Sequence, residues 1–312
     1  MPRADIDVDI ESVINELSTL QDLVRWGVSR FSEARLFYGH GTDNAIDEAT
    51  VLVLHALHLP GQLPSGFIHC RLTAAERRTA VDLLMRRIAE RRPAAYLMGE
   101  AWFAGMDFYV DERVVIPRSP IAELIEQGFE PWLAGHQVDR VLDLCTGSGC
   151  IAIACAHLFE SAHVDAVDIS EAALEVAARN VERHGLASRV ELIHGDLFSG
   201  VQGLRYDLIV SNPPYVSRSE WQTLPAEYHH EPRPGLESGE EGLDCVVAIL
   251  RRAIDYLTPG GILVVEVGYS RPALERRFPE VMFLWPEFER GGEGVFVMTY
   301  DELQQYQPYF GA

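Results

Sequence analysis

The chain contains no lysine, and all 26 of its basic residues are arginine. This absence excludes enzymes that form a Schiff base on lysine and nucleotide hydrolases that use a P-loop lysine. The 47 acidic residues outnumber the arginines and give a formal net charge of −21. Such a charge opposes binding to a phosphate backbone and favours a basic protein partner. Acidity that serves solubility alone remains an equally good interpretation.

Cysteine is also scarce, and its spacing matches no common framework. The five cysteines, at positions 70, 145, 150, 155 and 245, are odd in number and include no C-x-x-C pair. This pattern argues against a disulfide framework and against a zinc site, so we predict no metal. We expect the cysteines to act as small buried hydrophobic side chains.

Long apolar runs are missing as well. No stretch approaches the roughly 18 apolar residues that suggest a membrane span. The beginning of the chain, MPRADIDVDIESVINEL, lacks the basic-then-apolar order of a signal peptide. The content of 47% hydrophobic and 23% charged residues is typical of a globular protein. We therefore expect a cytoplasmic protein without a membrane partner.

Residues 1–92 predict a small helical domain for substrate recognition. Ile10, Val13, Ile14 and Leu17 have the spacing of one helical face. The segment TDNAIDEATVLVLHALHLPG starts with capping residues and ends in a Pro-Gly pair, as helices often do. The segment RLTAAERRTAVDLLMRRIAERRP predicts a further helix whose arginines could contact RNA. A solvated outer face explains them better, because acidic residues interrupt the run.

Residues 93–120, rich in aromatic and β-branched side chains, predict a β-hairpin linker. Residues 121–312 predict an α/β domain, because strands alternate with helices after about residue 138. The predicted strands are RVLDLC, HVDAVDI, VELIHGD, YDLIVSN and GILVVEVG. The segments VMFLWPEF and GEGVFVMTY predict an antiparallel hairpin at the edge. The expected fold class is therefore α/β, with a doubly wound, Rossmann-like sheet.

The first strand leads into a glycine loop, DLCTGSGCIA. Gly147, Gly149 and Ala152 match the pattern G-x-G-x-x-G/A, which lets a nucleoside cofactor approach a helix N-terminus. Asp168 ends the next strand, where a carboxylate can accept hydrogen bonds from ribose hydroxyls. Asp143 would oppose the pyrophosphate of a dinucleotide, whereas a cofactor with a positive charge, such as S-adenosylmethionine, would suit it.

Asp196 ends the third strand and could accept a hydrogen bond from an adenine amino group. Loop capping is the alternative role for both Asp143 and Asp196. A dinucleotide oxidoreductase is the weaker alternative for the whole site, because the fourth strand ends in NPPY, which hydride transfer does not need.

The fourth strand stops at Asn212, followed by Pro213, Pro214 and Tyr215. The two prolines stiffen the backbone and remove backbone donors. The side-chain oxygen of Asn212 and the carbonyl of Pro213 can accept the two N–H groups of a planar amide or amine. Tyr215 can pack on that planar group. Orientation and electrostatics can then promote methyl transfer to a nitrogen with a delocalised lone pair, without a metal.

Together, DLCTGSG, VDIS, GDLF and SNPPYV resemble the class I S-adenosylmethionine-dependent methyltransferases of the NPPY type. With VIPRSPIAELI, the preceding hairpin and the helical N-terminal domain, nearly the whole chain resembles the protein-glutamine N5-methyltransferases. One bacterial branch of that family acts on translation release factors, and another acts on large-subunit ribosomal protein three. The stretches VDERVVIPRSPIAELI, EYHHEPRPGLESGEEGLD and FERGGEGVFVMT resemble the ribosomal-protein branch. Release-factor enzymes typically have Pro-Arg-Pro-Asp/Glu-Thr-Glu where residues 117–122 of this chain are PRSPIA.

The resemblance implies methyl transfer from S-adenosylmethionine to N5 of a glutamine in a large-subunit ribosomal protein, with S-adenosylhomocysteine as the product. It implies catalytic roles for Asn212, Pro213 and Tyr215, and places Pro214 with them in the substrate site. The implied cofactor contacts are Asp143, Thr146, Gly147, Ser148, Gly149, Asp168, Asp196 and Asn212.

Other roles stay open. The region around Phe108 and Pro117–Arg118 is implied to border the cofactor or the substrate entrance. Glu266 either faces the pocket or has a structural role, and His229–Glu231 could form a flap or serve as surface or capping residues. Methylation of release factors and adenine-N6 methylation of nucleic acid are the alternative enzyme functions, and an inactive binding module is the alternative of a different class. The adenine enzyme needs a basic groove, so we expect no sequence-specific nucleic-acid partner.

Overall fold

The computed structural model describes residues 9–311 and separates into two compact units. One unit comprises residues up to 100 together with Pro225–His230, and the other comprises residues 101–224 and 231 onward. Residues 1–8 of the predicted helical domain, and residue 312, lie outside the described residues. Among residues 9–311, no helix combines the length and the apolar composition that crossing a bilayer requires.

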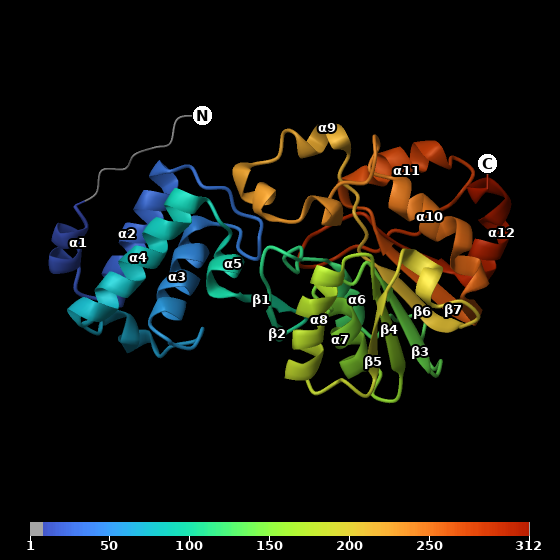
Figure 1. Ribbon diagram of the computed structural model, residues 1–312, viewed down its shortest axis with the longest axis horizontal. Coiled ribbons are helices and arrows are strands. Elements are labelled where there is room, and N and C mark those ends of the chain that lie inside the picture. Colours follow the sequence, from blue (N-terminus) through green and yellow to red (C-terminus); the bar gives the residue numbers. More distant parts are fainter. Residues whose placement is uncertain (1–8, 312) are drawn as a thin grey trace. The chain divides into compact units, whose positions relative to one another are not determined.

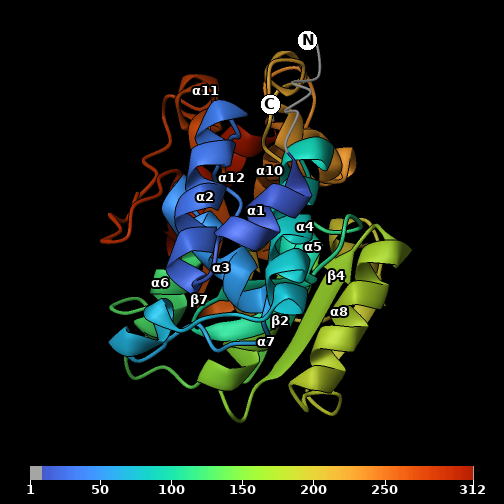
Figure 2. The same cartoon turned by 90° about the vertical axis from the view of Figure 1, so that its left-hand side faces the viewer.

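The first unit is a small helical bundle whose central helices are α2, α3 and α4 (Figure 2). Its helices are α1 (Ile10–Glu16), α2 (Leu20–Glu33), α3 (Ala45–Ala56), α4 (Ala74–Glu90) and α5 (Ala94–Met98). Two of them begin at threonine capping boxes, which satisfy backbone donors that a helix start leaves free. A Cβ on Gly27 would lie 3.1 Å from a methyl carbon of Leu84, so glycine permits the close approach of α2 and α4.

A buried ion cluster lies inside the helical unit. Arg87 of α4 is fully buried, and its Nε donates to Glu48 at 2.7 Å. Glu227 is also fully buried, pairs with Arg91 at 2.8 Å, and accepts from the backbone N of Phe37. The interpretation of the α4 arginines as a solvated face is therefore wrong for Arg87. Its partners are distant in sequence, so the local charge pattern could not indicate them.

The second unit contains a six-stranded sheet with the order β5-β4-β3-β6-β7-β8 (Figure 1). Its strands are β3 (Arg140–Leu144), β4 (His163–Asp168), β5 (Val190–His194), β6 (Tyr206–Ser211), β7 (Leu257–Glu266) and β8 (Val295–Thr299). The pairs from β5 to β7 are parallel and β8 is antiparallel. The strand order reverses between β3 and β6, which makes this pair the switch point where ligands bind in such sheets.

Helices cover both faces of this sheet (Figure 1). The helices of this unit are α6 (Ile121–Glu126), α7 (Cys150–Leu158), α8 (Glu171–Arg183), α9 (Arg218–Trp221), α10 (Asp244–Arg252), α11 (Arg271–Arg277) and α12 (Tyr300–Phe310), and the short α9 has no buried residue and belongs to neither core. One apolar core joins α6, α7 and α8 to the sheet, and a second core joins α10 and α12 to the opposite face. Apolar side chains on both faces explain why the strands read as continuous hydrophobic runs.

The predicted hairpin linker contains two short strands, β1 (Glu100–Phe103) and β2 (Met106–Tyr109). At the far edge of the main sheet the predicted antiparallel addition is present as β8. Its expected partner segment, residues 281–288, contributes a single bridge, Leu284 to Val297, instead of a strand. Pro286 lies in that segment and cannot donate to a ladder, which gives a physical reason for the short pairing.

Candidate active site

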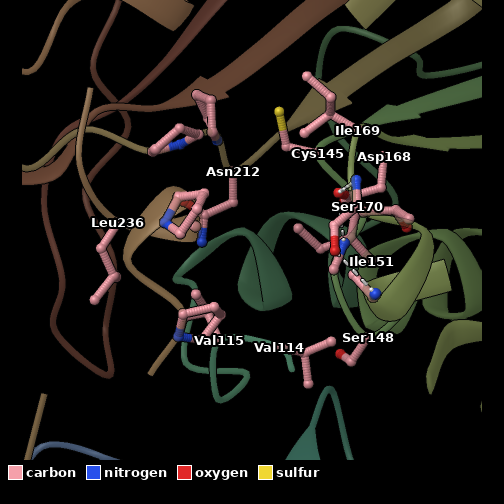
Figure 3. A pocket seen from close by; sticks show the side chains of 18 of the residues that line it. Val114, Val115, Cys145, Ser148, Ile151, Asp168, Ile169, Ser170, Asn212 and Leu236 are labelled. Atoms are coloured by element: carbon pink, nitrogen blue, oxygen red, sulfur yellow. Dashed lines mark hydrogen bonds between the residues drawn. The ribbon is translucent and has the colours of Figure 1, made fainter. Parts of the chain in front are cut away.

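A cavity of about 340 Å³ opens at the carboxyl ends of β3, β4 and β6. Figure 3 shows Asn212 on one side of it and Asp168, Ser170 and Ile151 on the other. Of the predicted site residues, the lining includes Thr146, Gly147, Ser148, Asp168, Asp196, Asn212, Pro213, Pro214 and Tyr215. Gly149 and Asp143 do not belong to the lining. The volume falls within the range of small-molecule sites.

The glycine loop joins β3 to the start of α7. Gly147 and Gly149 have φ angles of +56° and +79°, a region that side chains other than glycine rarely adopt. A Cβ on Gly149 would also lie 3.3 Å from that of Ala177, so this glycine serves packing against α8. A Cβ on Gly147 would meet nothing within 4 Å, so the backbone there faces open space.

Asp168 lies at the end of β4 and binds the loop directly. Its Oδ2 accepts from the backbone N of Gly147 at 2.9 Å, and its Oδ1 accepts from the backbone N of Ser170 at 2.9 Å. Burial raises the pKa of Asp168, and these backbone hydrogen bonds lower it in part. The carboxylate thus sets the loop geometry while it remains part of the cavity lining.

Asp143 lies beneath the loop and is fully buried. Its Oδ2 accepts from Thr146 Oγ1 at 2.6 Å and from the backbone N of Ala152 at 3.1 Å. Its Oδ1 has no hydrogen-bonding partner within residues 9–311. Burial raises the pKa of Asp143 to about 7 despite the two hydrogen bonds. The geometry is that of a residue supporting the loop from below.

Asp196 follows β5, is exposed, and lines the cavity. Its backbone N donates to Ser199 Oγ at 2.8 Å, which closes the short turn after the strand. The turn leaves the Asp196 side chain at the wall beside Gly195 and Leu197.

The Asn212–Tyr215 segment continues β6 into the cavity. Ser211 is fully buried, and its Oγ donates to the carbonyl of Leu144 at 2.8 Å, which fastens the strand end to β3. Within residues 9–311, the structure gives the side-chain amide of Asn212 no hydrogen-bonding partner. Its oxygen is therefore free to accept from a ligand. Tyr215 contributes to the wall, and its hydroxyl donates to Glu266 Oε1 at 2.8 Å.

Of the two places predicted to border the cofactor or the substrate entrance, Pro117–Arg118 does line the cavity and Phe108 does not. Pro117 and Arg118 line the cavity, whereas Phe108 is fully buried in the core against α7 and α8. Arg118 donates from both terminal nitrogens to Glu231, at 2.6 and 2.8 Å. Glu231 is itself buried, so it anchors a loop instead of lying on the surface.

Sequence reasoning missed the wall formed by Pro232, Pro234, Gly235 and Leu236, and the two cysteines Cys145 and Cys245. The cysteine sulfur atoms lie 3.9 Å apart, although the residues are 100 positions apart in the chain. The proline-rich stretch EPRPG, residues 231–235, could have indicated a rigid part of the cavity lining, because its prolines stiffen the backbone as those of NPPY do.

Comparison with known proteins identifies the relatives of this chain. Residues 130–227 match the family model described as methyltransferase small domain. The chain is similar to the ribosomal protein uL3 glutamine methyltransferase of Xanthomonas campestris pv. campestris, with 54% identity over 93% of this chain and 94% of that protein. The protein of the same name from Francisella tularensis subsp. tularensis is 46% identical, over 96% of each chain.

Among solved structures, the chain is similar to the hMettl16 catalytic domain in complex with MAT2A 3'UTR hairpin 6. The TM-score is 0.50 with 16% identity, over 62% of this chain and 75% of that chain. At this level of identity the likeness shows a shared fold.

Proposed function

The chain belongs to the family of ribosomal protein uL3 glutamine methyltransferases, and from that premise we propose that it methylates the side-chain nitrogen N5 of a glutamine in uL3. S-adenosylmethionine is the proposed methyl donor. One observation supports the proposal most directly: the Gly147–Gly149 loop and the Asn212–Tyr215 segment meet at one cavity. A nucleoside-binding loop and an amide-binding segment are the two parts that this reaction needs.

The residues at the cavity fit S-adenosylmethionine. The open backbone at Gly147 allows a ligand to approach, and the Asp168 carboxylate is available for ribose hydroxyls. Two arginines, Arg113 and Arg118, also line the cavity, but each already pairs with acidic residues. Arg113 pairs with Asp111 and Glu175. Arg118 pairs with Glu231. The local charge therefore suits a cationic ligand. Bound there, S-adenosylmethionine would supply a methyl group on a sulfonium centre.

The chain's own contribution to transfer is orientation of the substrate amide. The Asn212 side-chain oxygen accepts one N–H of the glutamine amide, and the Pro213 carbonyl accepts the other. Because both acceptors are fixed, they direct the amide nitrogen toward the methyl donor at the Gly147–Gly149 loop. They also polarise the N–H bonds of the amide. Tyr215, in the wall, limits access of water. Orientation of this kind can supply a large part of the lowering of the barrier.

The protein substrate is recognised first by charge. A net charge of −21 attracts a basic protein and accelerates the encounter, and this attraction weakens as salt screens it. The helical unit, whose described residues contribute nothing to the cavity lining, is the proposed recognition domain.

Incubation with labelled S-adenosylmethionine tests the function. The full-length protein is mixed with large-subunit proteins, intact subunits, release factors and ribosomal RNA from a strain that lacks the enzyme. We expect label on uL3 at a glutamine. Label on a release factor would assign the chain to the sister branch, and label on RNA would contradict the amide assignment. Calorimetry with S-adenosylhomocysteine and with NAD tests the cofactor separately, and NAD binding would contradict it.

A further inference from the structure

Tyr215 is held in place by contacts on several sides. Its hydroxyl donates to Glu266, and its carbonyl accepts from Ser270 Oγ at 2.7 Å. Gly268 lies against the ring, where an added Cβ would come within 2.7 Å of Tyr215 Cε2. An added Cβ on Gly242 would collide with the Tyr215 carbonyl oxygen. These contacts leave the ring little freedom to move.

Glu266, the last residue of β7, is 5% exposed and uses both carboxylate oxygens. Oε1 accepts from Tyr215 at 2.8 Å, and Oε2 accepts from Ser119 Oγ at 2.5 Å. A carboxylate can accept from two hydroxyl donors at once, whereas a neutral amide offers a single oxygen. Within residues 9–311 no arginine bonds to Glu266 directly, and burial raises the pKa of Glu266 although Arg118 and the two hydroxyl donors lower it in part. Burial of a carboxylate in such surroundings is unfavourable, which points to a role beyond stability.

The strand register places Glu266 beside the Asn212–Tyr215 segment. Ser211 is opposite Val265 in the β6–β7 pairing, so Glu266 follows at the level where β6 becomes the segment. The segment therefore has two fixed ends. Ser211 is bonded to Leu144 at the start, and Tyr215 is bonded to Glu266 at the finish.

We propose that Glu266, oriented by Ser119, is a positioning residue for methyl transfer. Its bond to Tyr215 fixes the far end of the segment that presents Asn212 and Pro213 to the substrate. Glu266 does not line the cavity and acts through Tyr215. The inference rests on the proposed function for its kinetic consequence, but the geometric part stands on the contacts of this unit.

The chain provides a matched control at the opposite end of β6. Tyr206 begins the strand, and its hydroxyl donates to Asp165 Oδ2 at 2.7 Å. Both residues are buried, and neither lines the cavity. Tyr206→Phe removes a tyrosine–carboxylate bond of the same kind from the start of β6, without altering the site.

A double-mutant cycle tests whether Tyr215 and Glu266 act together on kcat. We expect Tyr215→Phe and Glu266→Leu each to lower kcat for uL3 methylation about tenfold, as expected for loss of a hydrogen bond to a charged group. The kcat of the double variant should also be about tenfold lower than that of the wild type, because both changes remove the same Tyr215–Glu266 hydrogen bond. The KM for S-adenosylmethionine should stay unchanged, and Ser119→Ala should lower kcat to a smaller degree. Tyr206→Phe should retain kcat. If the two single losses multiply in the double variant, or if Glu266→Leu keeps the wild-type kcat, the proposal is overturned.

Hydrogen exchange without substrate separates this proposal from the proposed function. The backbone amide of Val216, which donates to the carbonyl of Leu236 at 2.8 Å, should exchange faster in Tyr215→Phe and Glu266→Leu than in the wild type. Its exchange in Tyr206→Phe should match the wild type. If the wild type does not methylate uL3, the proposed function fails, yet the exchange experiment still decides whether Glu266 fixes the segment. Equal exchange in all variants would overturn the positioning role.

Discussion

The carboxylates at the two ends of the parallel sheet have different partners. At the amino end, Asp165 accepts from an Arg140 guanidinium nitrogen at 2.6 Å and from Tyr206 at 2.7 Å. Asp207 accepts from the backbone N atoms of Asp139 and Arg140, at 2.8 and 3.1 Å. Burial alone would raise the pKa of Asp207, but these hydrogen bonds lower it overall. Donors therefore compensate the Asp207 carboxylate and Asp165 Oδ2, whereas Asp165 Oδ1 has no hydrogen-bond partner within residues 9–311.

At the carboxyl end, Asp143 and Asp168 accept from backbone N–H groups and a hydroxyl, and burial raises the pKa of both. In the part of the chain from residue 9 to 311, no arginine pairs with either carboxylate. The same residue type therefore serves stability at one end of the sheet. At the other end, Asp168 places a carboxylate in the cavity lining, where a cationic ligand can compensate its charge.

Asn212→Ala, with the largest expected effect, tests whether the carboxyl end of the sheet serves function and not stability. Methyl transfer should fall at least about a hundredfold, the scale of losing one preorganised polar contact to the reacting group. The change leaves β6 and the glycine loop intact, so affinity for S-adenosylhomocysteine and the melting temperature should remain close to wild type. Single-turnover rates, calorimetry and thermal unfolding measure the three quantities. Wild-type turnover would remove Asn212 from the mechanism.

Asp165→Ala tests the amino end, where we expect the opposite outcome. The variant leaves the buried Tyr206 hydroxyl and the Arg140 guanidinium without their acceptor, so the free energy of unfolding should fall by about 2 kcal/mol. Activity per folded molecule should be retained. Denaturant unfolding measures the loss, with Glu191→Ala, an exposed neighbour on β5, as the control. A loss of turnover without a loss of stability would contradict the division between the two ends.

Asp168→Asn sharpens the comparison within the carboxyl end. The amide keeps one acceptor for the two backbone N–H groups of Gly147 and Ser170 and removes the negative charge. Affinity for S-adenosylmethionine should fall about tenfold, as for loss of one hydrogen bond to a charged group. Titration calorimetry measures it, and the matched change Asp165→Asn should leave the affinity unaltered. Equal affinities in both variants would show that Asp168 does not contribute to binding.

Local signals in the sequence predict much of this unit. The alternation of strands and helices indicates the sheet, and the glycine spacing indicates the loop at its switch point. The sequence does not reveal the support beneath these parts. Ser119 and Glu266 are 147 positions apart, so no short motif contains their contact. The orientation of Asp143 likewise depends on Thr146 and Ala152 folding over it, which a strand pattern does not specify.

The smallest expected effect concerns the pH dependence at Asp143. Its pKa is raised to about 7 in the folded protein by burial, above the value of about 3.9 in an unfolded chain. The folded state therefore holds the proton more tightly, and this contribution to stability is lost as pH rises toward and through about 7. Asp143→Asn removes the titration. Compared with wild type, the variant should become relatively more stable by about 1 kcal/mol between pH 6 and pH 8. Denaturant unfolding at both pH values measures this change, and parallel pH profiles would show that Asp143 stays ionised.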